Sequence, residues 1–382
     1  MFEILDNQSQ DAVIKVIGVG GCGGNAVDHM IACGLQGVEF IAANTDAQAL
    51  SKSDAHVKLQ LGNSITKGLG AGANPEIGRE SALEDREKIA EVIDGADMLF
   101  ITAGMGGGTG TGAAPVIAEV AKELGILTVA VVTKPFVFEG RRLKVANSGI
   151  EALSQNVDSL IIIPNEKLMQ VLGEDVSVLD AFKAANEVLH GAVSGIAEVI
   201  SCPGLVNVDF ADVRTVMSEM GMAMMGSSKA QGVERARLAA EQAVMSPLLE
   251  DVNLSGARGM LVNITASHSL KMKEIHQVMQ TIREYTAEDA TVIFGAVFDE
   301  NMNEDLRVTM VATGLGMPSQ ARQQKPLTIV QKTGTDNVEM GYAEGDAPAV
   351  IRSGRRAAAV EAMKASGVDL LDIPAFLRKQ AD

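Results

Sequence analysis

The stretch that most constrains this chain is GMGGGTGTG, residues Gly104–Gly112. It follows an apolar run, Met98 to Ile101, that is typical of a buried strand, and it precedes a helix-like segment, Thr111 to Leu124. Glycines let backbone N–H groups approach a ligand without Cβ clashes and reach positive φ at low cost. A helix N-terminus adds unpaired donors and about half a positive charge. These features predict an anion-binding turn, with Pro115 in the first turn of the helix, rather than a flexible linker.

Composition narrows the class of protein. With 382 residues, 47% of them hydrophobic, the chain is long enough for two or three globular domains with a buried core. A net charge of −17 and the lack of Trp disfavour nucleic-acid binding through a basic or aromatic surface. An acidic protein that binds phosphates must rely on backbone dipoles and a metal ion, which agrees with the glycine-rich turn.

The sequence carries no sign of export or membrane insertion. The N-terminal MFEILDNQSQ is short and acidic, unlike a signal peptide, and no run approaches the roughly 18 apolar residues of a membrane span. The three cysteines, Cys22, Cys33 and Cys202, have no paired spacing, which favours a reducing compartment. We therefore expect a cytoplasmic protein.

A second glycine-rich turn lies near the start of the chain. The apolar run Ala12 to Val19 predicts a buried strand, which leads into GVGGCGGNAV and a helix to about Cys33. Within this turn, Gly18-x-Gly20-x-x-Gly23 has the spacing of the dinucleotide-binding fingerprint. On its own this match is weak.

A dinucleotide site would also need an acidic residue after the next strand. That strand, Val38 to Ala43, is followed by Asn44 and Asp46, and Asp46 could hold a ribose. A nicotinamide-dependent oxidoreductase therefore stays open as an alternative, although it leaves GMGGGTGTG without a role.

A third glycine-rich loop, KGLGAGANP at Lys67 to Pro75, is either a flap over the outer phosphates or an ordinary surface loop. One amphipathic helix is expected from Ser81 to Ile93. Continuous apolar runs at Gly125 to Thr133 and Val157 to Ile163 alternate with helices. This alternation predicts a parallel sheet covered on both faces.

Polar residues follow these strands at the sheet edge where open α/β folds bind ligands. Glu139, in PFVFEGRR, could accept hydrogen bonds from a ribose, although a solvated charge cluster at a helix start with Arg141 and Arg142 explains it too. Asn165 follows the strand that ends at Ile163.

A long helix is predicted from Val176 to Cys202, because apolar residues recur at three- and four-residue steps from Leu179 to Ile200. Phe182 and Asn186 lie one turn apart on it and could sandwich and read a purine. The periodicity alone favours a core position for Phe182.

The second half of the chain is predicted to form a smaller α+β domain. Helices are expected at Val233 to Met245 and Met272 to Arg283, and strands at Met260 to Ile264, Thr291 to Phe298 and Arg307 to Thr313. We expect the last two strands to be hairpin-like neighbours in a mixed sheet.

Before these elements, Asp209 and Asp212 form a pair that could orient a water or a metal ion, and Asp212 could also cap a helix beginning at Val213. The five histidines, His29, His56, His190, His268 and His276, show no metal-ligand spacing.

Beyond about Gly316 the periodicity fails, and the composition up to Ser366 predicts a disordered linker. The apolar tail DLLDIPAFL, Asp369 to Leu377, is expected to bind a partner.

The motif GGGTGTG at Gly106 to Gly112 resembles the signature of the tubulin/FtsZ superfamily of GTPases. Together with GVGGCGGNAV, NTDAQAL, GLGAGANPE, NVDFADVRTVM and DIPAFLRKQAD, it makes the chain similar to the bacterial cell-division members of that superfamily. The resemblance covers Ala12 to about Met317 and resumes in the tail. It implies a tubulin-like parallel-sheet domain, a long central helix and a second, smaller α+β domain.

The resemblance also implies a GTP site, with Mg²⁺ bound through the phosphates and no metal ligands from the protein. Backbone groups of the glycine turns would hold the phosphates, Glu139 and Arg142 the ribose region, and Asn165, Phe182 and Asn186 the guanine. The superfamily usually has this arginine four residues after the glutamate. In this chain Arg142 comes one residue earlier than that, and the adjacent Arg141 is the alternative. The rest of the implied nucleotide-binding set is Gly20, Gly21, Cys22, Gly23, Gly24, Asn25, Asn44, Ala71, Gly72, Ala73, Gly107, Gly108, Thr109 and Gly110.

In this superfamily the catalytic residues act on the GTP of the next subunit, so hydrolysis requires a head-to-tail filament. Asn207, Asp209 and Asp212 would take that part here. The tail would bind membrane-tethering division proteins such as FtsA and ZipA at midcell, beneath the inner membrane. A nucleotide-binding scaffold without hydrolysis is the remaining alternative. The expected segments are an extension (1–11), a GTP-binding domain (12–175), the central helix (176–202), a polymerisation domain (203–316), a linker (317–368) and the tail (369–382).

Overall fold

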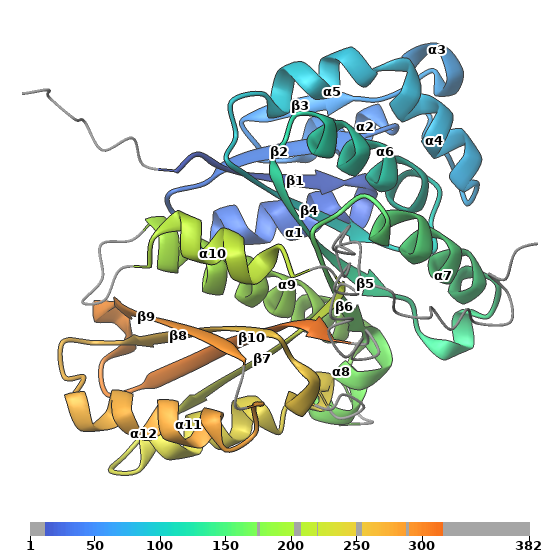
Figure 1. The fold of residues 1–382 in the computed structure, drawn as a ribbon. Coiled ribbons are helices and arrows are strands. Elements are labelled where there is room, and N and C mark those ends of the chain that lie inside the picture. Colours follow the sequence, from blue (N-terminus) through green and yellow to red (C-terminus); the bar gives the residue numbers. More distant parts are fainter. Residues whose placement is uncertain are drawn as a thin grey trace, which may run out of the picture. The chain divides into compact units, whose positions relative to one another are not determined.

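The computed structural model describes residues 12–173, 176–201, 208–219, 221–249, 254–287 and 290–315. These residues form one ten-stranded sheet with the order β3-β2-β1-β4-β5-β6-β7-β10-β8-β9. All neighbours from β3 to β7 are parallel, and β10 runs antiparallel to β7 and β8 (Figure 1). The expected mostly parallel α/β sheet with a mixed second part is confirmed. The N-terminal extension, the linker and the tail lie outside the described residues.

The first part of the chain alternates strands and helices, as the apolar runs predict. The short strand β3, which has two exposed residues, and the short helices α2, α3 and α8 were not predicted. The elements are β1 (Ile14–Val19), α1 (Gly20–Ala32), β2 (Glu39–Asn44), α2 (Ala47–Lys52), β3 (Val57–Gln60), α3 (Asn63–Thr66), α4 (Pro75–Glu84), α5 (Arg86–Ile93), β4 (Met98–Gly104), α6 (Thr109–Glu123), β5 (Leu127–Lys134), α7 (Arg141–Ser154), β6 (Ser159–Pro164) and α8 (Asn165–Leu172).

Two helices replace the single helix expected from Ser81 to Ile93. The chain turns at Asp85, whose side chain is buried. Its carboxylate accepts a hydrogen bond from the Gly62 N–H at 2.7 Å and pairs with the Lys88 Nζ at 2.6 Å. A buried carboxylate needs such partners, so tertiary contacts end α4 where local periodicity would continue it.

The helix after the glycine-rich turn also begins earlier than expected. The sequence predicted Pro115 in the first turn of this helix. Because α6 starts at Thr109, Pro115 lies inside the helix instead. Gly110 and Gly112 of this helix lie too close to the backbone of Gly104 and Pro75 to admit a Cβ, and residue periodicity does not reveal such contacts.

Successive side chains of these strands point to opposite faces of the sheet, and each face has its own hydrophobic core. On one face, Ile17 and Ile101 pack against α4, α5, α6 and α7. On the other face, Val16 and Phe100 pack against α1 and α9. Both faces of this part of the sheet are therefore covered, which explains why its strands read as unbroken apolar runs.

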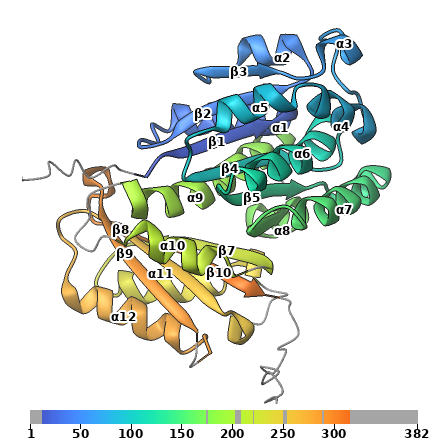
Figure 2. The same ribbon diagram turned by 45° about the horizontal axis from the view of Figure 1, so that its top comes forward.

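The central helix α9 (Val178–Ser201) joins the two parts of the sheet (Figure 2). Its buried residues Leu189, Val193 and Ile196 belong to a core that also contains residues of α1, β6, β8 and β10. At its start, however, Leu179 is 65% and Phe182 is 50% exposed, so the periodicity-based core prediction for Phe182 is wrong.

The second part of the chain contains α10 (Phe210–Met217), β7 (Gly221–Ala230), α11 (Arg235–Val244), β8 (Gly259–Ala266), α12 (Met272–Arg283), β9 (Thr291–Phe298) and β10 (Leu306–Leu315). The last two strands are not neighbours. Strand β8 lies between them, parallel to β9 and antiparallel to β10. The hairpin expectation is wrong because pairing across the sheet, not closeness in sequence, decides the order. Among the helices that the structure describes, none has both the length and the apolar character to cross a bilayer.

Two glycines one turn apart on α9 test its packing. A Cβ added at Gly195 would lie 2.6 Å from the Cγ2 of Thr309, a buried β-branched residue of β10, whereas one at Gly191 meets nothing closer than 4.0 Å. We expect Gly195→Ala to lower the free energy of unfolding by about 1–3 kcal/mol through overpacking. Gly191→Ala should raise it by about 0.5–1 kcal/mol, because alanine is the better helix former. Urea unfolding of both variants provides the comparison, and an equal response would contradict this packing.

Candidate functional site

The N-termini of α1 and α6 meet at the edge of the sheet. Helix α1 begins directly after β1, and α6 begins at Thr109 after the turn that follows β4. A Cβ added at Gly20 would lie 3.0 Å from the backbone nitrogen of Gly110, and Gly20 has φ +75°. The strand order reverses between β1 and β4, which is where open α/β sheets bind ligands. Two helix dipoles thus direct their positive ends at one place.

The glycines of the first turn serve two purposes. A Cβ at Gly18 would lie 2.3 Å from the carbonyl oxygen of Gly23, and one at Gly23 would lie 2.3 Å from that of Thr102. These glycines therefore let α1 pack closely on β1 and β4. At Gly21 and Gly24, by contrast, an added Cβ has no described heavy atom within 4 Å. Space therefore remains beside the turn for a ligand that backbone N–H groups can reach.

Hydrogen bonds join the third glycine-rich loop to the same turn. The Thr45 hydroxyl accepts from the Ala71 N–H at 3.0 Å and lies 2.6 Å from the Thr109 hydroxyl. The Gly108 N–H donates to the Gly72 carbonyl at 3.0 Å. Its N–H is therefore already bonded within the protein, although Gly108 was expected to hold a phosphate. Thr45 is fully buried and was missed by the sequence analysis; its place beside Asn44 at the end of a strand was the available signal.

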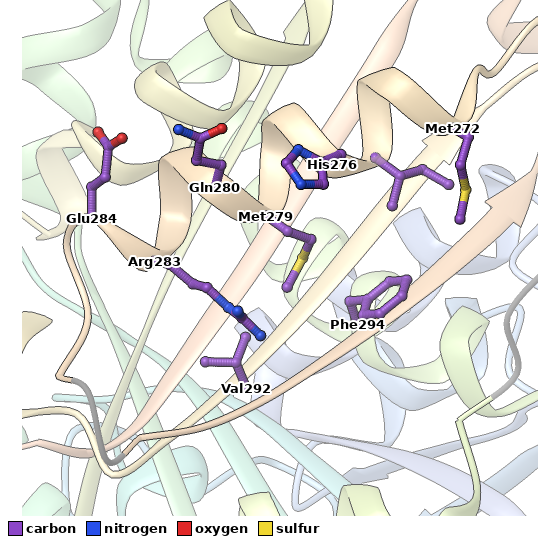
Figure 3. Close-up of a pocket in the computed structure, with 9 residues that line it drawn as sticks. Met272, His276, Met279, Gln280, Arg283, Glu284, Val292 and Phe294 are labelled. Carbon is purple, nitrogen blue, oxygen red and sulfur yellow. The ribbon is translucent and has the colours of Figure 1, made fainter.

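A cavity of about 320 Å³ lies between the first turn and the end of β2. Members of the predicted set that line it are Gly20, Gly21, Gly24, Asn25 and Asn44. A larger cavity of about 690 Å³ lies elsewhere, between Met272, His276 and Met279 of α12 and Phe294 of β9 (Figure 3). It contains no glycine turn, and its lining combines apolar side chains with the polar or charged side chains of His276, Gln280, Arg283 and Glu284.

The residues expected to bind a base come from two helices, Asn165 from α8 and Phe182 and Asn186 from α9. Asn165, the first residue of α8, is buried, and its Oδ1 has no hydrogen-bond partner in the described part of the chain. A buried amide oxygen without a partner costs about 1–3 kcal/mol, which favours a ligand that donates to it. The half-exposed Phe182 ring makes an edge contact with Phe136, which follows β5, with the centroids 6.3 Å apart. Asn186 lies one turn further along α9.

The glutamate and arginine expected at the ribose form an ion pair with each other. The Arg142 Nη1 lies 2.5 Å from the Glu139 Oε2, and the Glu139 Oε1 accepts from the Phe136 N–H at 3.1 Å. The arginine that meets Glu139 is thus Arg142 and not Arg141.

Asp46 caps a helix. Its Oδ1 accepts from the N–H groups of Gln48 and Ala49, at 2.8 and 3.1 Å. The carboxylate that a dinucleotide site would direct to a ribose is therefore used at the start of α2. The nicotinamide alternative is not supported.

The acidic pair lies on α10, which packs against β8 and β9. The helix begins at Phe210, so Asp209 occupies the N-cap position and Asp212 lies in the first turn. The expectation that Asp212 caps a helix from Val213 is wrong, because the helix starts three residues earlier. Both side chains are exposed, and neither forms a hydrogen bond or ion pair with another described residue. Asn207 lies outside the described residues.

Comparison with known proteins is consistent along the whole chain. The model "Tubulin/FtsZ family, GTPase domain" matches residues 13–173, and "FtsZ family, C-terminal domain" matches residues 221–316. The cell division protein FtsZ of Pseudomonas aeruginosa is 58% identical, with 100% of both chains covered. That of Coxiella burnetii is 57% identical, with 99% of both chains covered.

Solved structures of related proteins have a similar fold. An FtsZ dimer from M. jannaschii matches with a TM-score of 0.78 at 45% identity, over 82% of this chain and 90% of that one. CetZ2 from Haloferax volcanii, solved as a GTPgS-bound protofilament, matches with a TM-score of 0.68 over 81% of this chain and 95% of that one. At 20% identity, this second match shows the fold alone.

Thr45 offers a test of how the loops are joined. Thr45→Val keeps the shape of the side chain but leaves the Ala71 N–H and the Thr109 hydroxyl without their partner. We expect the free energy of unfolding to fall by about 1–3 kcal/mol. Thr45→Ser, the control, keeps the hydroxyl and should cost less, about 1 kcal/mol for the lost methyl group. If urea unfolding finds the valine variant as stable as the serine variant, the hydroxyl does not join these loops.

Proposed function

The chain belongs to the FtsZ family of the tubulin superfamily and is a cell-division GTPase, and we propose that it hydrolyses GTP at the contact between two of its own copies. The observation that carries this proposal is the separation of two half-sites. The anion site lies at the N-termini of α1 and α6, whereas the unpartnered carboxylates of Asp209 and Asp212 lie on α10.

The phosphates of GTP would bind at the two helix N-termini. The open space beside Gly21, Gly24 and Gly107 supports this, because a ligand oxygen there can approach backbone donors without meeting a side chain. Binding by dipoles also suits a chain with net charge −17, since it needs no cluster of basic side chains. Ala71, Gly72 and Ala73 belong to the loop tied to this turn and would lie beside the outermost phosphate.

The guanine would occupy the ends of β5 and β6. The unpartnered Asn165 Oδ1 can accept from the base, and the exposed Phe182 ring offers a stacking surface. A site that hydrogen-bonds a base edge rejects bases that lack the matching donors, because its buried polar atoms would stay unpaired. Asn186, on the same helix as Phe182, would contribute the second amide.

We propose that Mg²⁺ is held through the phosphates. One oxygen of the Asp28 carboxylate at the cavity, Oδ1, accepts hydrogen bonds from the Ser53 hydroxyl at 2.7 Å and the Asp54 N–H at 2.8 Å. The open glycine turns fit a metal that arrives with the nucleotide. When bound, such an ion neutralises part of the phosphate charge.

Hydrolysis would be completed by a second copy of the chain. Asp209 and Asp212 would orient the attacking water, and a carboxylate can accept its proton. The two surfaces at such a contact differ, so repetition of the contact produces an open head-to-tail filament. This arrangement explains why two adjacent carboxylates are exposed without a partner in their own chain.

Further parts of the function follow from the sequence. We propose residues 12–175 as the GTP-binding domain, 176–202 as the connecting helix and 203–316 as the domain that activates the neighbour. Residues 369–382 would bind membrane-tethering division proteins such as FtsA and ZipA, which would hold filaments at midcell. A chain truncated after Ser366 should therefore lose pull-down of those partners.

Phe182 tests the base site. We expect Phe182→Ala to weaken GDP binding by about 1–3 kcal/mol, the usual contribution of an aromatic ring stacked on a base. Leu179→Ala is the matched control, because Leu179 is an exposed apolar residue one turn earlier on α9. Calorimetric titration with GDP should show a loss for the first variant only. Equal affinities would remove Phe182 from the site.

The shared site can be tested by mixing two inactive variants. Asp212→Ala keeps the phosphate turn and lacks an activating carboxylate, whereas Gly107→Asp places a negative charge in open space beside that turn. Each alone should release little phosphate from GTP. Their equimolar mixture should regain activity at roughly a quarter of its contacts, namely those that join an intact turn to an intact acidic pair.

The control for this experiment is Glu219→Ala, which removes a partly exposed carboxylate beyond α10 that pairs with Arg258, and it should keep wild-type turnover. Co-pelleting establishes that the two variants assemble together. Mixed filaments that release no more phosphate than the separate variants would refute a site built by two subunits.

A further inference from the structure

A histidine, a cysteine and a glutamate meet where α1 packs against α9 (Figures 1 and 2). The His29 Nε2 lies 3.0 Å from the Glu187 Oε2, and the Cys33 Sγ lies 3.7 Å from the same nitrogen. All three ligand atoms lie within 4.8 Å of one another. None of these residues belongs to the nucleotide-binding set or the acidic pair.

The helical spacing directs these groups at each other. His29 and Cys33 are four residues apart at the C-terminal end of α1, so they lie on one face. Glu187 and His190 are three residues apart on α9. The His190 ring lies edge-on to that of His29, with the centroids 6.1 Å apart, and its buried Nδ1 has no hydrogen-bond partner in the described part of the chain.

The set of donors selects a class of metal. Imidazole nitrogen, thiolate sulfur and carboxylate oxygen are the ligands of Zn²⁺ and similar transition metals, whereas Mg²⁺ and Ca²⁺ take oxygen ligands. With metal–ligand bonds of about 2.0–2.3 Å, a tetrahedral site separates its donor atoms by roughly 3.3–3.8 Å. The separations of 3.0 and 3.7 Å are close to this range. Cys33 and Glu187 are exposed, so an ion can enter from solvent.

Without a cation the cluster is electrostatically unfavourable for a thiolate. Partial burial and the neighbouring Glu187 carboxylate both raise the pKa of the Cys33 thiol. A divalent cation changes this, because it attracts the thiolate and the carboxylate together.

We propose that His29, Cys33 and Glu187 form a zinc site that links α1 to α9, with water in the fourth position and His190 beside it. The site is independent of the proposed hydrolysis. It holds together the helix that begins at the phosphate turn and the helix that carries Phe182 and Asn186. Zinc should therefore raise the temperature of unfolding.

Cobalt provides a direct readout, because a thiolate bound to Co²⁺ gives a charge-transfer absorption in the near ultraviolet. Phosphate-bound cobalt gives none, so ions held by nucleotide do not interfere. We expect the full-length, GDP-bound protein to develop this band at one equivalent of Co²⁺ and to lose it on addition of Zn²⁺. Cys33→Ser should abolish the band, and Cys22→Ser should keep it.

The other two ligands are tested through affinity. His29→Gln and Glu187→Gln should weaken Co²⁺ binding at least about tenfold. The matched control is His268→Gln, since His268 also faces a glutamate, Glu300, at 3.9 Å. Zinc should raise the unfolding temperature of the wild type and of His268→Gln but not of Cys33→Ser.

Two results would overturn the proposal. One is the lack of a charge-transfer band in the wild type, which would leave only the hydrogen bond between His29 and Glu187. The other is a band of equal intensity in Cys33→Ser, which would assign the thiolate to another cysteine.

Discussion

The close approach of the backbone at Gly20 and Gly110 is the contact on which the rest of the structure depends. It brings the positive ends of two helices together, and only residues without a Cβ allow it. Neighbouring glycines maintain it, since Gly18 and Gly23 let α1 pack directly on the sheet. Unpaired donors concentrated in this way need an anion, so an acidic chain can bind a triphosphate without a basic surface.

The parallel strands place the other parts of the proposed nucleotide site at the same edge. The turns after β1 and β4, the loop fastened by Thr45, and Asn165 after β6 come from distant parts of the sequence, yet they follow strands that all point one way. Asp209 and Asp212 do not lie at this edge. They belong to α10, which packs on β8 and β9 in the second part of the sheet. Under the proposed function, a site divided in this way would make assembly a condition of turnover.

Sequence reasoning succeeded where local chemistry decides the structure. The glycine turns, most strands and the bounds of α12 and β9 follow from apolar runs and from turn residues. It failed where distant contacts decide, as at Asp85, which turns the chain because Gly62 needs its carboxylate. Periodicity placed Phe182 in the core, but the ring is half exposed, and only the family resemblance corrected this. Spacing could not bring His29 and Cys33 to Glu187, more than a hundred positions away, because helix packing alone unites them.

The sheet is continuous, but its two parts meet over a short length. Between β6 and β7 only Ser159, Leu160 and Ile161 find partners, whereas the neighbouring pair β7 and β10 is matched along most of both strands. A tilt of one part against the other would have to break only these few ladder bonds while α9 stays packed on both sides. The ladder between β6 and β7 is therefore the shortest in the sheet, and much of the connection between its two parts depends on side-chain packing against α9.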